Sequence, residues 1–326
     1  MSSKNFLPIA YHQWEWKPFA NATLSVATHA LHYGTGAFGG MRATPNPEKA
    51  NEILLFRLPD HARRLAQSAK FFGIWAPFER SCREATEDFP ISDTPRFSQA
   101  YFENLIREFL IRNTPTKPIY MRPLIYTSDL DISPRLHDIE WDVILYGLEL
   151  GDYLAPGGIT CTVSSWMRQQ DASFPLRGKI TGAYITSALA KTEAHRRGFD
   201  EAILMNAAGK VSEGSAMNIF LVRNGIIRTP AVTEDILEGI TRASVIEVAR
   251  SMGYTVIEWQ IDKSELYIAD EVFFTGTAAR ITPVKQIEHY MLSEQHPITN
   301  ILKARLDTIV LWNDEEFGKW VEKVRV

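Results

Sequence analysis

A lysine lies between two glycines in the middle of the chain, where Gly178-Lys179 is followed by Thr181-Gly182 and then by Tyr184. The two glycines come just before a predicted helix. A lysine amine in such a place can serve as a nucleophile toward a carbonyl group. Because most lysines are solvated surface charges, the pattern alone favours an ordinary surface lysine.

Three other segments have residue types that suit ligand binding. Residues 237–242 (LEGITR) begin a predicted helix, and the first N–H groups of a helix can bind an anion because they lack intrahelical partners. Residues 275–279 (TGTAA) end a strand with small side chains that let a backbone approach a ligand. Glu213 follows a strand and precedes Gly214-Ser215. An ordinary capped helix or turn looks the same, so none of these segments is decisive alone.

Residues 34–39 (GTGAFG) fit the G-x-G-x-x-G pattern of dinucleotide-binding proteins, and Asp60 follows about 20 residues later. This pattern would predict a dehydrogenase. Its context argues against that function, because residues 28–33 are not an apolar strand and residues 41–47 cannot continue as the crossover helix. We therefore interpret the glycines as a tight turn.

Apolar periodicity predicts the elements that position these residues. Strands are expected over 52–56, 119–126, 143–148, 161–166, 201–205, 210–213, 219–222, 226–229, 255–261 and 271–275, and helices over 59–72, 99–111, 183–197 and 239–252. Residues 127–140 are expected to form a loop. Asn224-Gly225 predicts a type I′ hairpin turn, since both central residues of that turn need positive φ. Hairpins beside isolated helices indicate an α+β fold with mixed or antiparallel sheets.

Length and composition predict a two-domain globular protein. The chain has 326 residues, of which 45% are hydrophobic and 23% are charged. The break at Pro156-Gly157-Gly158 places the expected boundary between residues 150 and 151, which gives one domain over 1–150 and another over 151–326.

Charge and cysteine usage exclude several classes of partner. Lys and Arg number 35 and Asp and Glu number 39, which gives a net charge of −4 without a basic block, so we expect no nucleic-acid partner and no anionic membrane. No apolar run approaches the roughly 18 residues of a membrane span, and residues 1–17 lack the apolar core of a signal peptide. Cys82 and Cys161 stand apart without a His cluster, so we expect no metal site, no disulfide framework and a cytoplasmic location.

Six motifs, taken in order along the chain, resemble those of the branched-chain amino acid aminotransferases, which are class IV, fold type IV pyridoxal-phosphate enzymes. The motifs are residues 31–38 (LHYGTGAF), 120–123 (YMRP), Gly178-Lys179 with Tyr184, 211–214 (VSEG), 239–242 (GITR) and 275–279 (TGTAA). The resemblance covers nearly the whole chain. It implies a smaller N-terminal α/β domain, a larger C-terminal mixed-sheet domain, the cofactor pyridoxal 5′-phosphate, and a homodimer or higher homo-oligomer.

The resemblance also implies roles around the cofactor. Lys179 would hold it as a Schiff base and then carry a proton between the substrate α-carbon and the cofactor. Glu213 would keep the pyridine nitrogen protonated, which makes the ring a better electron sink, and Tyr184 would hydrogen-bond the phenolic oxygen. Leu237 would lie against the ring. The phosphate would be held at a helix start and by one arginine, through Gly239, Ile240, Thr241, Thr277 and Arg64.

For the substrate, the resemblance implies a pocket that accepts branched-chain L-amino acids (Leu, Ile, Val) and 2-oxoglutarate in turn, by a ping-pong mechanism. The α-carboxylate would be bound by Tyr120 and by the N–H groups of Thr277 and Ala278. The side-chain pocket would be walled by Tyr33, Phe38, Gly40 and Tyr153. Arg122, supported by Arg42, would receive the distal carboxylate of glutamate.

One departure from the family pattern affects the expected substrate range. Many members have Glu after the Phe of the opening motif, whereas this chain has Gly39 after Phe38, which leaves the hydrogen bonding near Arg42 open. The alternatives within the fold type are D-amino-acid transaminase, (R)-amine transaminase and aminodeoxychorismate lyase. The Tyr120-x-Arg122-Pro123 segment favours the branched-chain type, and intact Lys179 and Glu213 argue against a catalytically silent binding protein.

Overall fold

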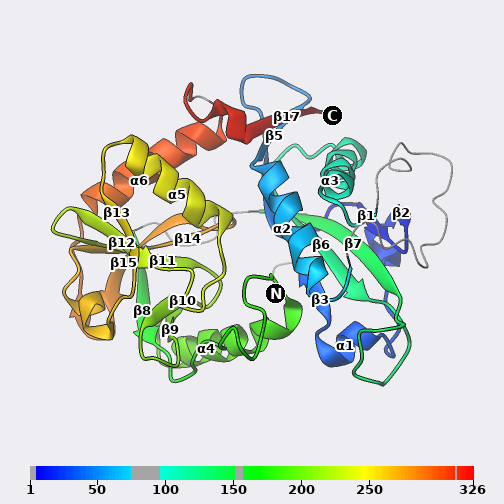
Figure 1. Ribbon diagram of the computed structural model, residues 1–326. Helices are drawn as coiled ribbons and strands as arrows, with labels where there is room; N and C mark the ends of the chain where they lie inside the picture. The colour runs from blue at the N-terminus through cyan, green and yellow to red at the C-terminus, as the bar shows by residue number, and fades with distance from the viewer. Residues whose placement is uncertain (1–4, 75–95, 151–156, 313) are drawn as a thin grey trace. The chain divides into compact units, whose positions relative to one another are not determined.

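Figure 1 shows the computed structural model of the chain, which describes residues 5–74, 96–150, 157–312 and 314–326. The chain divides into two compact units. The first consists of residues 1–151, 178–182 and 309–326, and the second of residues 152–177 and 183–308. Two segments from the second half of the sequence therefore belong to the first unit. The boundary expected between residues 150 and 151 adjoins a range outside the described residues, and it stays a prediction.

The first unit is built on an eight-stranded sheet whose pairings are all antiparallel. In spatial order the strands are β17 (Val321–Arg325), β5 (Glu52–Phe56), β4 (Met41–Pro45), β6 (Ile119–Thr127), β7 (Trp141–Glu149), β1 (Ile9–His12) and β2 (Glu15–Pro18), and β3 (Gly36–Phe38) pairs with β6. Sequence patterning did not predict β17. It pairs with β5 from Val321 opposite Phe56 to Arg325 opposite Glu52, so residues 321–325 join strands from the first half of the chain.

Two long helices of the first unit pack on each other, and a short one, α1 (His29–Tyr33), precedes β3. Helix α2 (Leu58–Lys70) has Pro59 in its first turn, where a missing N–H costs nothing. Helix α3 (Gln99–Asn113) starts at Ser98, whose hydroxyl accepts the Tyr101 N–H at 3.1 Å. Their core faces repeat at helical spacing and consist of Leu58, Ala62, Leu65 and Ala69 in α2 and of Tyr101, Phe102, Leu105 and Phe109 in α3.

The second unit contains a nine-stranded mixed sheet (Figure 1). In spatial order the strands are β10 (Val211–Gly214), β9 (Glu201–Met205), β8 (Ile159–Val163), β15 (Arg280–Ile287), β14 (Glu271–Gly276), β11 (Asn218–Arg223), β12 (Ile226–Pro230) and β13 (Val256–Trp259), and β16 (Tyr290–Met291) pairs with β15. Three pairings are parallel, β8 with β9, β8 with β15 and β12 with β13. The helices of this part of the chain are α4 (Tyr184–Arg196), α5 (Ile240–Ser251) and α6 (Pro297–Val310).

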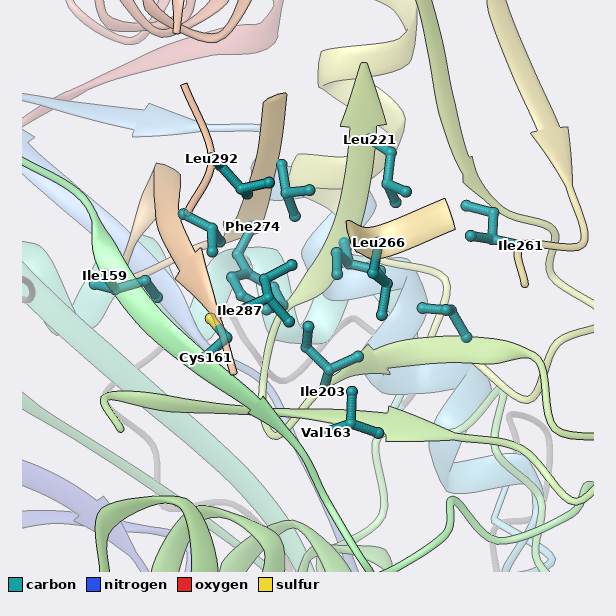
Figure 2. Packing of buried hydrophobic residues seen from close by; sticks show 14 of the residues in the cluster. Ile159, Cys161, Val163, Ile203, Leu221, Ile261, Leu266, Phe274, Ile287 and Leu292 are labelled. Carbon is teal, nitrogen blue, oxygen red and sulfur yellow. The ribbon is translucent and has the colours of Figure 1, made fainter. Parts of the chain in front are cut away.

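The core of the second unit gathers apolar side chains from several strands, as Figure 2 shows. Ile159, Cys161 and Val163 alternate along β8 and meet residues of β9, β11, β14 and β15 such as Ile203, Leu221, Phe274 and Ile287. Cys161 is fully buried in this cluster, and burial raises the pKa of its thiol well above the ordinary value. The residue therefore packs as a small apolar group.

Most of the expected elements are confirmed within one or two residues at each end. Asn224 and Gly225 both have positive φ, at 53° and 73°, as the predicted hairpin turn requires. The dehydrogenase alternative fails, because α1 precedes the glycine motif and strand β4 follows it where a crossover helix would be needed. The strand expected over 161–166 is wrong in extent. The observed strand, β8, spans Ile159–Val163. It ends there because the Ser164 hydroxyl and the Ser165 N–H donate to the Glu193 carboxylate.

No helix within the described ranges combines the length and the apolar character needed to cross a membrane. The described residues also contain no cluster of three or more His, Cys, Asp or Glu side chains that could hold a metal ion.

Candidate active site

The glycine motif of the first unit holds the main chain of Lys179. The Phe38 N–H donates to the Lys179 carbonyl at 2.9 Å, and the Gly182 N–H donates to the Gly34 carbonyl at 3.1 Å. Gly34 has a φ of 63°, and a Cβ on it would lie 2.9 Å from the Cα of Gly182. Glycine is required at position 34 both for this conformation and for this close approach. The glycine motif thus holds the main chain of residues 179–182 beside residues 34–38.

Helix α2 holds the same segment from another side. The Lys179 N–H donates to the Ser68 Oγ at 3.1 Å, and the Ser68 hydroxyl donates to the Arg64 carbonyl at 2.8 Å. His61, Arg64 and Ser68 lie three and four positions apart, so they share one face of the helix. The half-buried Arg64 is thereby carried on the same helix face that fixes Lys179.

The imidazole of His61 lies among positive charges. It is buried, and its Nδ1 has no hydrogen-bond partner among the described residues. Burial holds the pKa of His61 well below its ordinary value of 6.5, and the charges of Arg64, Lys179 and Arg57 lower this pKa further. His61 is therefore neutral, and the cations beside it provide the positive potential that an anionic ligand needs.

Arg122 is oriented by two aromatic rings. Its guanidinium carbon lies 4.6 Å from the centroid of the Phe38 ring and 5.3 Å from that of the Tyr120 ring, and its Nη2 donates to the Tyr120 hydroxyl at 3.3 Å. The Nε of Arg122 is buried and has no hydrogen-bond partner in the described part of the chain. A half-buried guanidinium with an unused, buried donor suits a carboxylate ligand.

Two glycines leave room for the side chains of Tyr120 and Pro123. A Cβ on Gly40 would lie 1.9 Å from the Tyr120 hydroxyl, and a Cβ on Gly39 would lie 2.8 Å from the Cγ of Pro123. In this chain a side chain at position 39 would therefore displace the Pro123 ring. Arg42 lies opposite Tyr120 in the ladder of β4 and β6, so the two residues share a face of the sheet.

Two of the predicted wall residues are not joined to this cluster by any contact described above. Tyr33 ends α1, is exposed, and donates its hydroxyl to the Ile132 carbonyl in the loop after β6. Tyr153 lies outside the described residues.

In the second unit, the carboxylate of Glu213 is buried and held on both oxygens. Its Oε1 lies 2.9 Å from Nη2 of Arg168, which is itself buried. Its Oε2 accepts from the Asn218 side-chain amide at 2.9 Å and from the Leu237 N–H at 3.1 Å. A buried carboxylate with a guanidinium partner and two donors is stabilised in its ionised form.

Helix α5 begins with buried residues and no side-chain cap. Gly239 is its N-cap and makes no side-chain hydrogen bond, while Ile240 and Thr241 are only 8% and 7% exposed. The first N–H groups of a helix have no intrahelical partners, and burying them uncapped is costly. The start of α5 therefore suits an anion that lies against these N–H groups.

Two other segments of the second unit carry predicted site residues. Thr277 and Ala278 are half-buried in the turn between β14 and β15, and Tyr184 is the first residue of α4. The hydroxyls of Ser212, which precedes Glu213, and of Thr275, which lies two residues before Thr277, are buried and have no hydrogen-bond partner among the described residues.

The structure brings predicted residues together within each unit. The first unit joins Phe38 to Lys179 and to Arg122, and Arg122 to Tyr120. The second unit joins Glu213 to Leu237, which comes just before the start of α5. Four neighbours of these residues were not predicted from the sequence, namely Ser68, His61, Arg168 and Asn218. The available signal was weak: the helical spacing of 61, 64 and 68, and the short distance in sequence from Glu213 to Asn218.

Comparisons with known proteins identify the family of the chain. Residues 36–287 match the family described as amino-transferase class IV. A probable branched-chain-amino-acid aminotransferase of Synechocystis sp. is 52% identical over 319 residues, which covers 98% of each chain. The crystal structure of the branched-chain aminotransferase from Thermoproteus uzoniensis with norvaline is similar with a TM-score of 0.88 and 35% identity, covering 98% of this chain and 100% of that one.

A third relative is the T.th. branched-chain amino acid aminotransferase complexed with N-(5′-phosphopyridoxyl)-L-glutamate. Its crystal structure is similar with a TM-score of 0.84 and 34% identity, covering 97% of this chain and 98% of that one. With its fold, its motifs and these relatives, the chain belongs to the class IV aminotransferases, in the family of the branched-chain-amino-acid aminotransferases.

Proposed function

We propose that the protein transfers the amino group between branched-chain L-amino acids (Leu, Ile, Val) and 2-oxoglutarate, with pyridoxal 5′-phosphate as cofactor, by a ping-pong mechanism. The names of its relatives support the donor class. The ligand in the T.th. structure joins a phosphopyridoxyl group to L-glutamate, which supports both the cofactor and the second substrate.

The observation that carries this proposal is the buried carboxylate of Glu213, whose two oxygens are held by the side chains of Arg168 and Asn218. When bound, the cofactor supplies a pyridinium ring that accepts electrons from the substrate α-carbon. An ionised, buried carboxylate is the partner that keeps a pyridine nitrogen protonated, and Arg168 and Asn218 hold Glu213 in that state. Leu237, whose N–H donates to Glu213, would lie against the ring, and Tyr184 would donate to its phenolic oxygen.

The residues that would hold the phosphate are of types that suit an anion. In the second unit they are the uncapped N–H groups at the start of α5, from Gly239 to Thr241, with the hydroxyl of Thr277. In the first unit, Arg64 belongs to the cation group beside neutral His61. A phosphate of charge near −2 suits such donors.

Lys179 would hold the cofactor covalently through Nζ and would move the proton at the substrate α-carbon, for which its amine must be neutral. Its main chain is fixed by Phe38 and Ser68, which limits the positions that the amine can reach. The Nζ atom lies 4.9 Å from the centroid of the Phe38 ring.

The substrate pocket would use the aromatic and cationic residues of the first unit. Arg122 would bind the distal carboxylate of glutamate through its unused Nε donor, with Arg42 nearby on the same sheet face. The α-carboxylate would be bound by the Tyr120 hydroxyl and by the N–H groups of Thr277 and Ala278. Tyr33, Phe38, Gly40 and Tyr153 would wall the aliphatic part. A homodimer or higher homo-oligomer and a cytoplasmic location complete the proposal.

Single-turnover half-reactions test the proposal. The cofactor-loaded protein is mixed with L-Leu, L-Ile or L-Val, and the protein loaded with pyridoxamine 5′-phosphate is mixed with 2-oxoglutarate. The change in cofactor absorption should be fast in both directions. D-alanine, an (R)-amine and aminodeoxychorismate serve as comparison substrates.

The two parts of the proposal fail separately in this experiment. Turnover confined to D-amino acids or simple amines would overturn the substrate assignment and leave the cofactor in place. Absence of any bound, absorbing cofactor after incubation with pyridoxal 5′-phosphate would overturn the whole proposal.

A further inference from the structure

Asn218 lies beside Glu213 because the chain reverses between them. The Gly214 N–H donates to the Met217 carbonyl at 2.7 Å, which closes a tight reversal at the end of β10. Glu213 and Asn218 flank this reversal, and their side chains are joined by a hydrogen bond. Asn218 is the first residue of β11 and is buried.

The side-chain amide of Asn218 donates two hydrogen bonds, both to groups of the proposed cofactor site. Nδ2 donates to the Glu213 Oε2 at 2.9 Å and to the Leu237 carbonyl at 2.9 Å. The Leu237 N–H donates to the same Glu213 oxygen at 3.1 Å. One amide therefore joins the carboxylate to the main chain that leads into α5.

The carbonyl oxygen of Asn218 faces the start of α5. A Cβ on Gly239 would lie 2.0 Å from the Asn218 Oδ1, and the next nearest atoms to that Cβ position are Asn218 Cγ at 3.2 Å and Arg242 Cβ at 3.4 Å. Gly239 has a φ of −73°, which any residue can adopt, so its backbone does not require glycine. Asn218 is thus the neighbour that excludes a side chain at position 239.

We propose that Asn218 is a positioning residue that sets the place of the Glu213 carboxylate relative to the N–H groups at the start of α5. These are the two groups that would hold opposite ends of the cofactor, its pyridine nitrogen and its phosphate. The inference rests on the proposed function and adds to it a residue that touches neither the substrate nor the reacting atoms. Gly239 serves the same arrangement by leaving room for Asn218.

The first test compares Asn218→Ala with a matched control, Asn206→Ala. Asn206 is also buried in the second unit and also donates its Nδ2 to a carboxylate, that of Glu234 at 2.8 Å, which is not part of the proposed site. Each cofactor-free variant is titrated with pyridoxal 5′-phosphate, and the absorption band gives the dissociation constant. Thermal unfolding of the cofactor-free proteins reports their stability separately.

We expect Asn218→Ala to weaken cofactor binding by about ten- to a hundredfold, since a hydrogen bond to a charged group is lost. The kcat should fall by a similar factor with little change in KM for leucine, because the loss affects the cofactor and not the substrate pocket. Asn206→Ala should lower thermal stability and leave the dissociation constant and the band position unchanged.

The second test is a double-mutant cycle with Gly239→Ala, which remains informative if Asn218→Ala folds poorly. The added methyl group must push Asn218 away from Glu213, so Gly239→Ala should reproduce the loss of cofactor affinity and the fall in kcat. Once Asn218 is already alanine, the same methyl group meets no obstacle. The double variant should therefore be no worse than Asn218→Ala alone.

The outcomes separate the inference from the proposed function. Wild-type protein that binds no pyridoxal 5′-phosphate would refute the proposed function. If the wild type binds the cofactor and Asn218→Ala matches Asn206→Ala in affinity, band position and kcat, the positioning role of Asn218 is wrong. Additive losses in the double variant would equally contradict it, since Gly239 would then act independently of Asn218.

Discussion

The Lys179 main-chain N–H donates to the Ser68 hydroxyl oxygen at 3.1 Å, a contact between residues 111 positions apart in the sequence. The same hydroxyl donates to the Arg64 carbonyl, so one side chain connects two of the residues proposed to hold the cofactor. Ser68 therefore fixes the main chain of Lys179 relative to helix α2 within the first unit.

Replacing Ser68 with Ala should lower the free energy of unfolding by about 1 to 3 kcal/mol, because the Lys179 N–H loses its acceptor in a partly buried place. Chemical denaturation of the cofactor-free protein measures this. Ser187→Ala, which removes a buried hydroxyl from α4, is the control and should cost less. Equal losses for both variants would mean that the contact to Lys179 contributes nothing specific.

The stability of the protein should depend on pH through His61. The pKa of His61 in the folded protein is held well below 6.5 by burial and by the nearby cations, whereas in the unfolded chain it returns to about 6.5. As the pH falls below 6.5, the unfolded chain gains a proton that the folded protein does not, so stability is lost, by at most about 1.4 kcal/mol per pH unit.

His61→Gln should remove this part of the pH dependence. Denaturation curves at pH 7.5, 6.5 and 5.5 give the slope for each variant, and His195→Gln, which changes an exposed imidazole in α4, is the control. If the wild type and His61→Gln lose stability in parallel below pH 6.5, the buried neutral state of His61 is contradicted.

Glu213→Gln should keep the fold and bind the cofactor but lose about 3 to 4 kcal/mol of transition-state stabilisation, the size typical of removing one preorganised electrostatic group. The measurement is kcat with leucine and 2-oxoglutarate. Glu201→Gln is the control, because Glu201 is another buried carboxylate of the second unit, paired with Lys191 at 2.8 Å. An unchanged kcat in Glu213→Gln would remove Glu213 from the mechanism.

Arg122→Ala should affect the two half-reactions unequally. Losing a charge-assisted contact should lower kcat/KM for glutamate or 2-oxoglutarate by about ten- to a hundredfold, with a smaller loss for leucine, whose isobutyl group does not need the guanidinium. Arg112→Ala is a suitable control, since Arg112 also stacks on an aromatic ring, 5.2 Å from the centroid of Trp16. Equal losses for both substrates would mean that Arg122 serves the shared α-carboxylate or the pocket structure.

Local patterns predicted those parts of the fold that depend on neighbouring residues. The Asn224-Gly225 turn follows from the backbone that two residues need, and α2 follows from apolar spacing with Pro59 in its first turn. Strand β17 has no such signal, because its register comes from pairing with β5, which lies far away in sequence. The same holds for β8, whose end depends on hydrogen bonds to Glu193.

The site could be predicted only as separate motifs. The glycines at 34 and 36 were visible in the sequence. Their carbonyl groups accept hydrogen bonds from Gly182 and Thr181, beside Lys179, and these long-range contacts cannot be read from the spacing. Arg168 shares no motif with Glu213, so only the folded chain reveals their ion pair. Long-range partners of this kind are fixed by tertiary packing rather than by local preference.

The central claim, that Lys179 is the covalent anchor of pyridoxal 5′-phosphate, is tested most directly by reducing the cofactor-loaded protein with borohydride and mapping the labelled peptide. The phosphopyridoxyl group should be found on Lys179 alone, and Lys179→Ala should carry no label and no transaminase activity while still binding some cofactor through its phosphate. Lys191, which pairs with Glu201, is the internal control and should remain unlabelled. A label on Lys191 or on any other lysine, or undiminished transamination by Lys179→Ala, would contradict the account.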